Sequence, residues 1–129
     1  MKALSDDSRL RIVSLLQRKS LCVCELEVLL SMSQSMASRH LLKLKQAGIV
    51  ASRRDAQWIH YRLHEAFLSD NGTLAAFLES KADSEPQLLA DRRQLDAYIQ
   101  SGMNCEQLSA GALASSEPPH ATQSPYPRR

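Results

Sequence analysis

Hydrophobic residues recur at helical spacing near the start of the chain. Within residues 6–19 the apolar positions fall mostly three and four apart, which is the repeat of a single buried helix face. Ser5 stands just before this stretch, and Asp6 and Asp7 place two carboxylates at the positive end of a helix dipole. The pattern predicts a helix over residues 6–19 with Ser5 as its N-cap.

Two further apolar runs follow, separated by a short polar break. Residues 21–30 are largely apolar, and residues 31–33 read Ser-Met-Ser. In residues 34–46, Ala37, Leu41 and Leu44 share one helix face. Gly48 stands where the C-terminal cap of a helix is expected. Two short helices around a three-residue turn are the pattern of a helix-turn-helix.

The hydrophobic period changes after Gly48. In residues 58–63 the side chains alternate with the two-residue period of a strand, and residues 50–54 provide a partner strand. The connection at residues 55–57 is short enough for a hairpin. A helix-turn-helix followed by a hairpin predicts a winged helix, mainly α with a small β-hairpin wing.

Apolar stripes mark two more helices in the second half of the chain. One includes residues 74–78, and a longer one over residues 88–99 is entered at Pro86, a favoured first-turn residue. The stripe of the longer helix consists of Leu88, Leu95, Tyr98 and Ile99. A winged helix of this size has little core to spare, so this stripe is expected to pack against a second copy.

These elements predict the domain organisation. Residues 1–100 form one winged-helix domain with a C-terminal dimerisation helix, so the protein is expected to be a homodimer. Residues 101–129 turn towards Ser, Ala, Gln and Pro, which predicts a disordered tail.

The charge distribution changes this picture by adding a candidate partner. The formal net charge of the 129 residues is only +2. Residues 1–64 nevertheless hold eleven Lys or Arg against five Asp or Glu, whereas residues 65–129 hold five against nine. A basic half beside an acidic half indicates nucleic-acid contact by the basic part.

Cellular location is predicted from what the sequence lacks. No run of 18 or more apolar residues suits a membrane span, and the N-terminus has no signal-peptide core, so a cytoplasmic protein without membrane contact is expected. Three cysteines, two of them only two apart, do not form a secreted disulfide framework. Reduced thiols used for binding or sensing are therefore favoured.

Four segments in this order carry a family resemblance. They are residues 4–10 (LSDDSRL), 21–26 (LCVCEL), 33–41 (SQSMASRHL) and 58–63 (WIHYRL). Together they resemble the ArsR/SmtB family of metal-responsive winged-helix repressors, in particular its arsenic-sensing members. The resemblance implies a metal-binding box at residues 21–26 and a DNA-recognition helix at residues 33–41.

The chain departs from the family pattern at two places. Family members usually carry about one helix of further residues before the first matching segment, so this chain is expected to lack that dimer helix or to start at a misplaced position. The arsenic box of well-known members also has a third cysteine where this chain has Glu27.

Cys22 and Cys24 are the candidate metal ligands. Trivalent arsenic is soft, and thiolates suit a soft ion better than carboxylates or imidazole. In a regular helix, residues two apart point about 200° away from each other, so one cysteine must lie at or before the helix start, or the turn must distort on binding. Forcing both sulfurs onto one ion would deform the first helix of the helix-turn-helix. A helix N-terminus is also expected to lower a thiol pKa.

The third bond to arsenic has two candidate sources, Cys105 and solvent hydroxide. Hydroxide is favoured because nothing in the sequence brings Cys105 close to the pair. Zinc is disfavoured because a structural zinc site needs four ligands and no histidine lies within 15 residues of Cys24.

The DNA contacts are predicted from helix-turn-helix geometry, in which the second helix presents its N-terminal residues to base edges. The candidates for base contact are Gln34, Ser35, Ser38 and Arg39. Lys43 and the wing residues Arg53 and Arg54 are expected to neutralise phosphates.

The expected function is a DNA-binding transcriptional repressor of an arsenic-resistance operon. The metal-free dimer needs no cofactor to bind double-stranded operator DNA, and As(III) or Sb(III) at the cysteine pair releases it. The alternative is a winged-helix repressor that senses another soft metal ion or thiol oxidation. An enzyme is not expected, because Cys-x-x-Cys beside a βαβ unit, a phosphate-binding glycine loop and a nucleophile elbow are all missing from the sequence.

Overall fold

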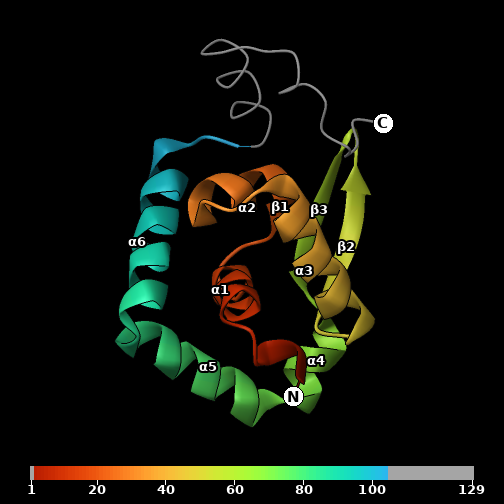
Figure 1. Ribbon diagram of the computed structural model, residues 1–129, viewed down its shortest axis with the longest axis vertical. Helices are drawn as coiled ribbons and strands as arrows, with labels where there is room; N and C mark the ends of the chain where they lie inside the picture. The colour runs from red at the N-terminus through yellow and green to blue at the C-terminus, as the bar shows by residue number, and fades with distance from the viewer. Residues whose placement is uncertain (1, 105–129) are drawn as a thin grey trace.

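One central helix is surrounded by the other elements in the computed structural model, which describes residues 2–104 (Figure 1). A short 3-10 helix, η1 (Lys2–Leu4), precedes the central helix α1 (Asp7–Leu16). The elements that follow are β1 (Leu21–Cys22), α2 (Val23–Leu30), α3 (Gln34–Gln46), β2 (Val50–Asp55), β3 (Trp58–Leu63), α4 (Glu65–Asp70), α5 (Gly72–Ser84) and α6 (Pro86–Ser101). The predicted mainly helical winged-helix fold is confirmed.

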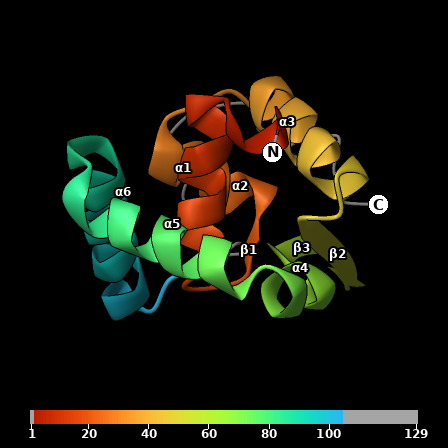
Figure 2. The ribbon, with the colours of Figure 1, turned by 90° about the horizontal axis from the view of Figure 1, so that it is seen from below.

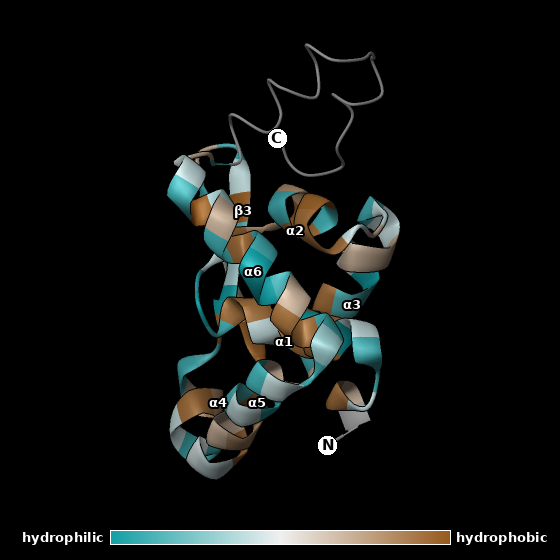
Figure 3. Ribbon diagram, turned by 90° about the vertical axis from the view of Figure 1, so that its left-hand side faces the viewer, coloured by the Kyte–Doolittle hydropathy of each residue, from teal (hydrophilic) through white to brown (hydrophobic). Residues whose placement is uncertain are grey.

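The layers become clear when the molecule is seen from below. Helix α5 crosses α1, with α6 at one end and α4 with the wing at the other (Figure 2). Apolar residues are concentrated in α1 and α2, whereas hydrophilic residues mark stretches of α5 and α6 (Figure 3). Within residues 2–104 no helix combines the length and apolar character that a membrane span requires. Residues 105–129, which include Cys105 and nearly all of the predicted tail, lie outside the described residues.

Helix α1 begins at Asp7, one residue later than predicted. Asp6, not Ser5, is the N-cap, and its Oδ1 accepts hydrogen bonds from the backbone N–H groups of Ser8 at 2.8 Å and Arg9 at 3.2 Å. These two bonds satisfy amides that have no partner within the helix, which is why the aspartate defines the start. The helix ends at Leu16, so the predicted extension to residue 19 is wrong.

The helix-turn-helix is confirmed with its predicted bounds for the second helix. Ser33 caps α3 by accepting a hydrogen bond from the Met36 N–H at 3.1 Å. Gly48 adopts a φ of 77° just after the helix, a left-handed conformation that glycine adopts without steric cost. The buried face of α3 consists of Ala37, Leu41 and Leu44, and it packs on α1 and α2.

The wing contains one strand more than the sequence pattern predicted. Strand β1 pairs with β3 in the order β1-β3-β2, with Leu21 opposite Tyr61. A strand of two residues is too short to show a periodicity, so the apolar run over residues 21–30 predicts helix from its first residue. Asp55 pairs with Trp58, so the hairpin loop has two residues rather than the three expected.

Helix α6 packs on its own chain, contrary to the prediction that its stripe is reserved for a second copy. Leu88, Leu95 and Tyr98 are buried in the common core, and Ile99 is 43% exposed. The guanidinium of Arg11 on α1 donates two hydrogen bonds to the buried Asp91 carboxylate, at 2.8 and 2.9 Å. Helix α5 packs on both α1 and α6, and helix α4, which the pattern did not predict, packs on α5.

The Asp6 cap can be tested by substitution. Asp6→Ala removes the acceptor for two amides and is expected to lower the free energy of unfolding by about 1 kcal/mol. Asp6→Asn keeps a good capping oxygen and is expected to retain most of that stability. Urea unfolding followed by circular dichroism measures both variants, and an equal loss in the two would show that the acceptor is not what stabilises the helix start.

The two ion pairs between α1 and α6 should differ in strength. Asp91→Ala leaves the half-buried Arg11 without its two charge-assisted bonds and is expected to cost about 2 kcal/mol. Asp96→Ala, on the same helix, breaks only the exposed pair with Arg18 and is expected to cost no more than about 0.5 kcal/mol. Comparable losses in urea unfolding would refute this ranking.

Candidate functional site

Helix α3 presents the predicted base-contact residues on its outer side. Ser35, Arg39 and Lys43 are exposed, and Gln34 and Ser38 are partly exposed. The opposite face is held in the core, so these side chains project from a fixed helix. The helix therefore meets the geometric requirement for an element that enters a DNA groove.

The wing carries its two predicted arginines close to its tip. Arg53 and Arg54 are exposed on β2, two and one residues before the strand ends. The Lys45 ammonium donates a hydrogen bond of 2.8 Å to the Ser52 hydroxyl, which connects the end of α3 to this strand. Helix α3 and the wing, which both carry exposed cations, are thus connected into one basic edge.

Part of the basic charge in the first half of the chain lies elsewhere and is ion-paired or hydrogen-bonded within the fold. Arg11 pairs with Asp91, and Arg18 pairs with Asp96 at 3.1 Å. The Arg9 Nε–H donates to the Ala3 carbonyl at 2.7 Å. Charge asymmetry along the sequence therefore reflects helix packing as well as a candidate DNA surface.

The cysteine pair lies where strand β1 gives way to α2. Cys22 is the N-cap of α2, with extended backbone angles (φ −93°, ψ 170°), and Cys24 lies in the first turn. The two Sγ atoms are 2.8 Å apart. Both sulfurs are therefore within reach of one ion, although two thiolates that each bind a metal at about 2.3 Å in a tetrahedral site lie about 3.8 Å apart. Cys22 is disulfide-bonded in this structure, so an ion shared by the two sulfurs requires the reduced protein. The prediction that one cysteine lies before the helix start is confirmed.

The expectation that the helix terminus lowers the thiol pKa is wrong for Cys24. Burial, together with the charges of Glu25 and Glu27, raises the pKa of the Cys24 thiol to about 12. Burial also raises the pKa of Glu27 to about 7. A soft ion that binds here must therefore displace a proton from Cys24.

The buried Glu25 holds the start of α2. Its Oε1 accepts a hydrogen bond of 2.8 Å from the Cys22 N–H, and its Oε2 accepts one from the Tyr98 hydroxyl of α6. Burial and this hydrogen bond raise the pKa of Tyr98. A glutamate three residues after an N-cap is a capping-box signal that the sequence contained, whereas the contact with Tyr98 spans 73 residues and had no local signal.

The described part of the chain does not assemble a complete metal site in advance. Between residues 2 and 104 no three His, Cys, Asp or Glu side chains are grouped closely enough to hold an ion. Cys105, the candidate third thiol, lies outside these residues.

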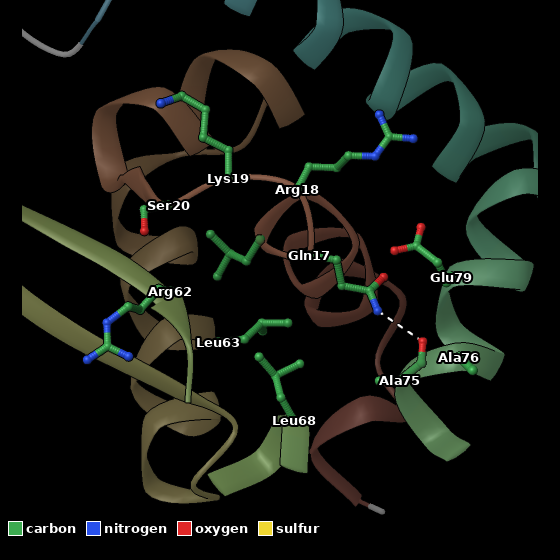
Figure 4. A pocket seen from close by; sticks show the side chains of 11 residues that line it. Gln17, Arg18, Lys19, Ser20, Arg62, Leu63, Leu68, Ala75, Ala76 and Glu79 are labelled. Atoms are coloured by element: carbon green, nitrogen blue, oxygen red, sulfur yellow. Dashed lines mark hydrogen bonds between the residues drawn. The ribbon is translucent and has the colours of Figure 1, made fainter. Parts of the chain in front are cut away.

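A cavity of about 460 Å³ opens on another side of the molecule, between α1, the end of β3, α4 and α5. Leu63 and Leu68 project into it, while Lys19 and Arg62 extend away from these leucines (Figure 4). Gln17 donates a hydrogen bond of 3.1 Å to the Ala75 carbonyl at its edge. Because its basic side chains do not converge, this cavity is not a candidate anion site.

The fold and the basic edge together define a winged helix-turn-helix protein. The profile of the family described as "Bacterial regulatory protein, arsR family" matches residues 6–52, which contain both the helix-turn-helix and the cysteine pair. The chain belongs to this family.

Two curated relatives each match about half of the chain. The arsenic resistance transcriptional regulator ArsR1 of Pseudomonas putida is 52% identical over 64 residues, which are 49% of this chain and 50% of that protein. The arsenical resistance operon repressor of Escherichia coli is 46% identical over 63 residues, 48% of this chain and 54% of that protein. The chain thus spans about half the length of the curated relatives it matches.

Solved structures extend the similarity beyond the helix-turn-helix. Reduced HlyU from Vibrio cholerae is 32% identical, with a TM-score of 0.56, over 65% of this chain and 82% of that one. The homodimeric winged helix-turn-helix DNA-binding domain of Mb0332 from Mycobacterium bovis is 28% identical, with a TM-score of 0.54, over 62% of this chain and 74% of that one.

Proposed function

We propose that this protein is an arsenite-responsive transcriptional repressor. The ion-free dimer occupies operator DNA, and arsenite or antimonite bound by Cys22 and Cys24 releases it. The observation that carries the proposal is the convergence of two sulfurs, 2.8 Å apart, at the first turn of the helix-turn-helix. Relatives that are 52% and 46% identical over about half of this chain are named as arsenic-resistance regulators, which supports arsenic as the ion.

The DNA surface consists of α3 and the wing. Gln34 and Arg39 are suited to bidentate contacts with adenine and guanine respectively, and Ser35 and Ser38 to single base contacts. The phosphate contacts are assigned to Lys43, Arg53 and Arg54. The exposure of these cations beside a helix with a buried inner face supports the assignment.

The dimer surface lies on α4 and α5 rather than on the stripe of α6. Leu68 and Phe77 are 41% and 59% exposed on these helices. Their burial against a second copy would remove apolar surface from water, and the homodimeric domain of Mb0332 supports such an assembly. A two-fold dimer would place the recognition helices about 34–36 Å apart on a pseudo-palindromic operator.

Release follows from a difference in affinity. Arsenite must bind the free dimer more tightly than the DNA-bound dimer, by a coupling free energy of about 1–3 kcal/mol. Deformation of the first turn of α2 supplies that difference, because α2 packs directly on α3. The proton that leaves Cys24 adds to the cost of binding in both states.

The thiol assignment is tested by an operator-binding titration with arsenite. A Cys22→Ser/Cys24→Ser variant is expected to bind the operator with unchanged affinity and to stay bound at arsenite concentrations that release the wild type. Release of this variant at the wild-type concentration would refute the thiol site. Cys105→Ser is expected to respond normally, since hydroxide supplies the third bond, and loss of its response would identify Cys105 as the third ligand. Antimonite, zinc and peroxide in the same assay compare the other candidate inducers.

The reading of DNA bases is tested separately. Arg39→Ala is expected to weaken specific binding by about 1–3 kcal/mol and to weaken binding to random DNA far less. Lys43→Ala, one helix turn away, is expected to weaken both to a similar extent and to reduce the salt dependence. Equal losses on both DNAs for Arg39→Ala would reassign this residue to a phosphate contact.

A further inference from the structure

A single buried carboxylate connects the cysteine pair to the last helix. Glu25 is 3% exposed and Tyr98 is 8% exposed, so this contact is shielded from water. The Cys22 N–H donates to one oxygen of Glu25, and the Tyr98 hydroxyl donates to the other. The Cys22 backbone and the C-terminal part of α6 therefore donate hydrogen bonds to the same Glu25 carboxylate.

The second of these hydrogen bonds exceeds what the helix start needs. A capping box is complete with the bond between Glu25 and the Cys22 amide. Bringing a tyrosine hydroxyl and a carboxylate together in the core carries a desolvation cost that an apolar pair of similar volume avoids. The contact is therefore better explained by the position it imposes on Cys22 than by stability.

That position matters for the sulfurs. Cys22 and Cys24 converge only because Cys22 keeps an extended backbone while Cys24 is helical. The bond from Glu25 fixes the Cys22 amide, and Tyr98 fixes Glu25. A shift of Cys22 towards an ion consequently moves the carboxylate relative to α6.

We propose that Glu25 and Tyr98 are positioning residues that couple ion binding at the cysteine pair to the placement of α6. This inference rests on the proposed function. Helix α6 is fastened to α1 by the pair between Arg11 and Asp91, and α1 packs on α3. A displacement of α6 thus reaches the recognition helix through α1, in addition to the direct packing of α2 on α3.

The first test needs neither DNA nor arsenite. Amide hydrogen exchange is measured by NMR on the full chain, for the wild type, Tyr98→Phe and Asp96→Asn. Tyr98→Phe is expected to speed exchange at the Cys22 amide by about threefold or more, with no change at core amides of α1 such as Val13. Asp96→Asn, which breaks an exposed α6 contact two residues away, is expected to leave Cys22 unchanged. An unchanged Cys22 amide in Tyr98→Phe, or equal acceleration in Asp96→Asn, would overturn the proposal.

The second test measures coupling as the ratio of operator affinities without and with saturating arsenite. Tyr98→Phe is expected to lower this ratio by about two- to thirtyfold while Asp96→Asn keeps it. Glu25→Met, which has neither acceptor oxygen, is expected to lower it too, and to have little further effect when combined with Tyr98→Phe, because both substitutions remove the same link. An unchanged ratio in Tyr98→Phe, or additive effects in the double variant, would overturn the proposal.

The two tests separate the failure of this inference from that of the proposed function. If arsenite does not release the wild type from DNA, the proposed function fails, and the exchange rates still decide whether Tyr98 positions Cys22. If Tyr98→Phe does not fold, Glu25→Met decides through the coupling ratio, and an unchanged ratio in that variant would overturn the proposal.

Discussion

The burial of α1 on all sides is the constraint on which the rest of this structure depends. Ile12 and Leu15 are fully buried, and α1 packs against α3, α5, α6 and β3. Each buried Leu or Ile side chain contributes about 1.5–3 kcal/mol relative to an exposed one. This one short helix supplies core contacts both to the helix-turn-helix and to the C-terminal helices. A change in either region is therefore transmitted to the other through α1.

Ion pairs add to the apolar packing between α1 and α6. The acidic second half of the chain provides Asp91 and Asp96, which pair with Arg11 and Arg18 on α1. Attraction between the halves therefore helps to hold α6 in place, while Arg39 and Lys43 on α3 and Arg53 on the wing stay exposed. The arginines of the first half therefore divide by position: two of them pair with α6, and those of α3 and the wing tip face solvent.

The cysteine pair shows how a local conflict is resolved by a change of backbone conformation. Two residues two apart diverge in a helix, but Cys22 belongs to a strand and Cys24 to the helix that follows. In this arrangement the Cys24 thiol is largely buried, and burial raises its pKa, which favours the protonated form. A site of this kind favours an ion whose bonds to sulfur are strong enough to replace that proton.

The sequence by itself determined the helix-turn-helix, the hairpin and the location of the cysteines, because these depend on short-range periodicity and on caps within a few residues. It also predicted the candidate DNA contacts, because the apolar residues of α3 mark its buried face and the polar residues on the opposite face are then exposed. It misplaced the cap of α1 from Asp6 to Ser5, because both residues are good caps and only the geometry of the first turn chooses between them. The tertiary structure alone decided that the stripe of α6 packs on α1, that a two-residue strand precedes α2, and that Glu25 meets Tyr98. These contacts join residues far apart in the chain, and no local periodicity records which distant surfaces a helix face will meet.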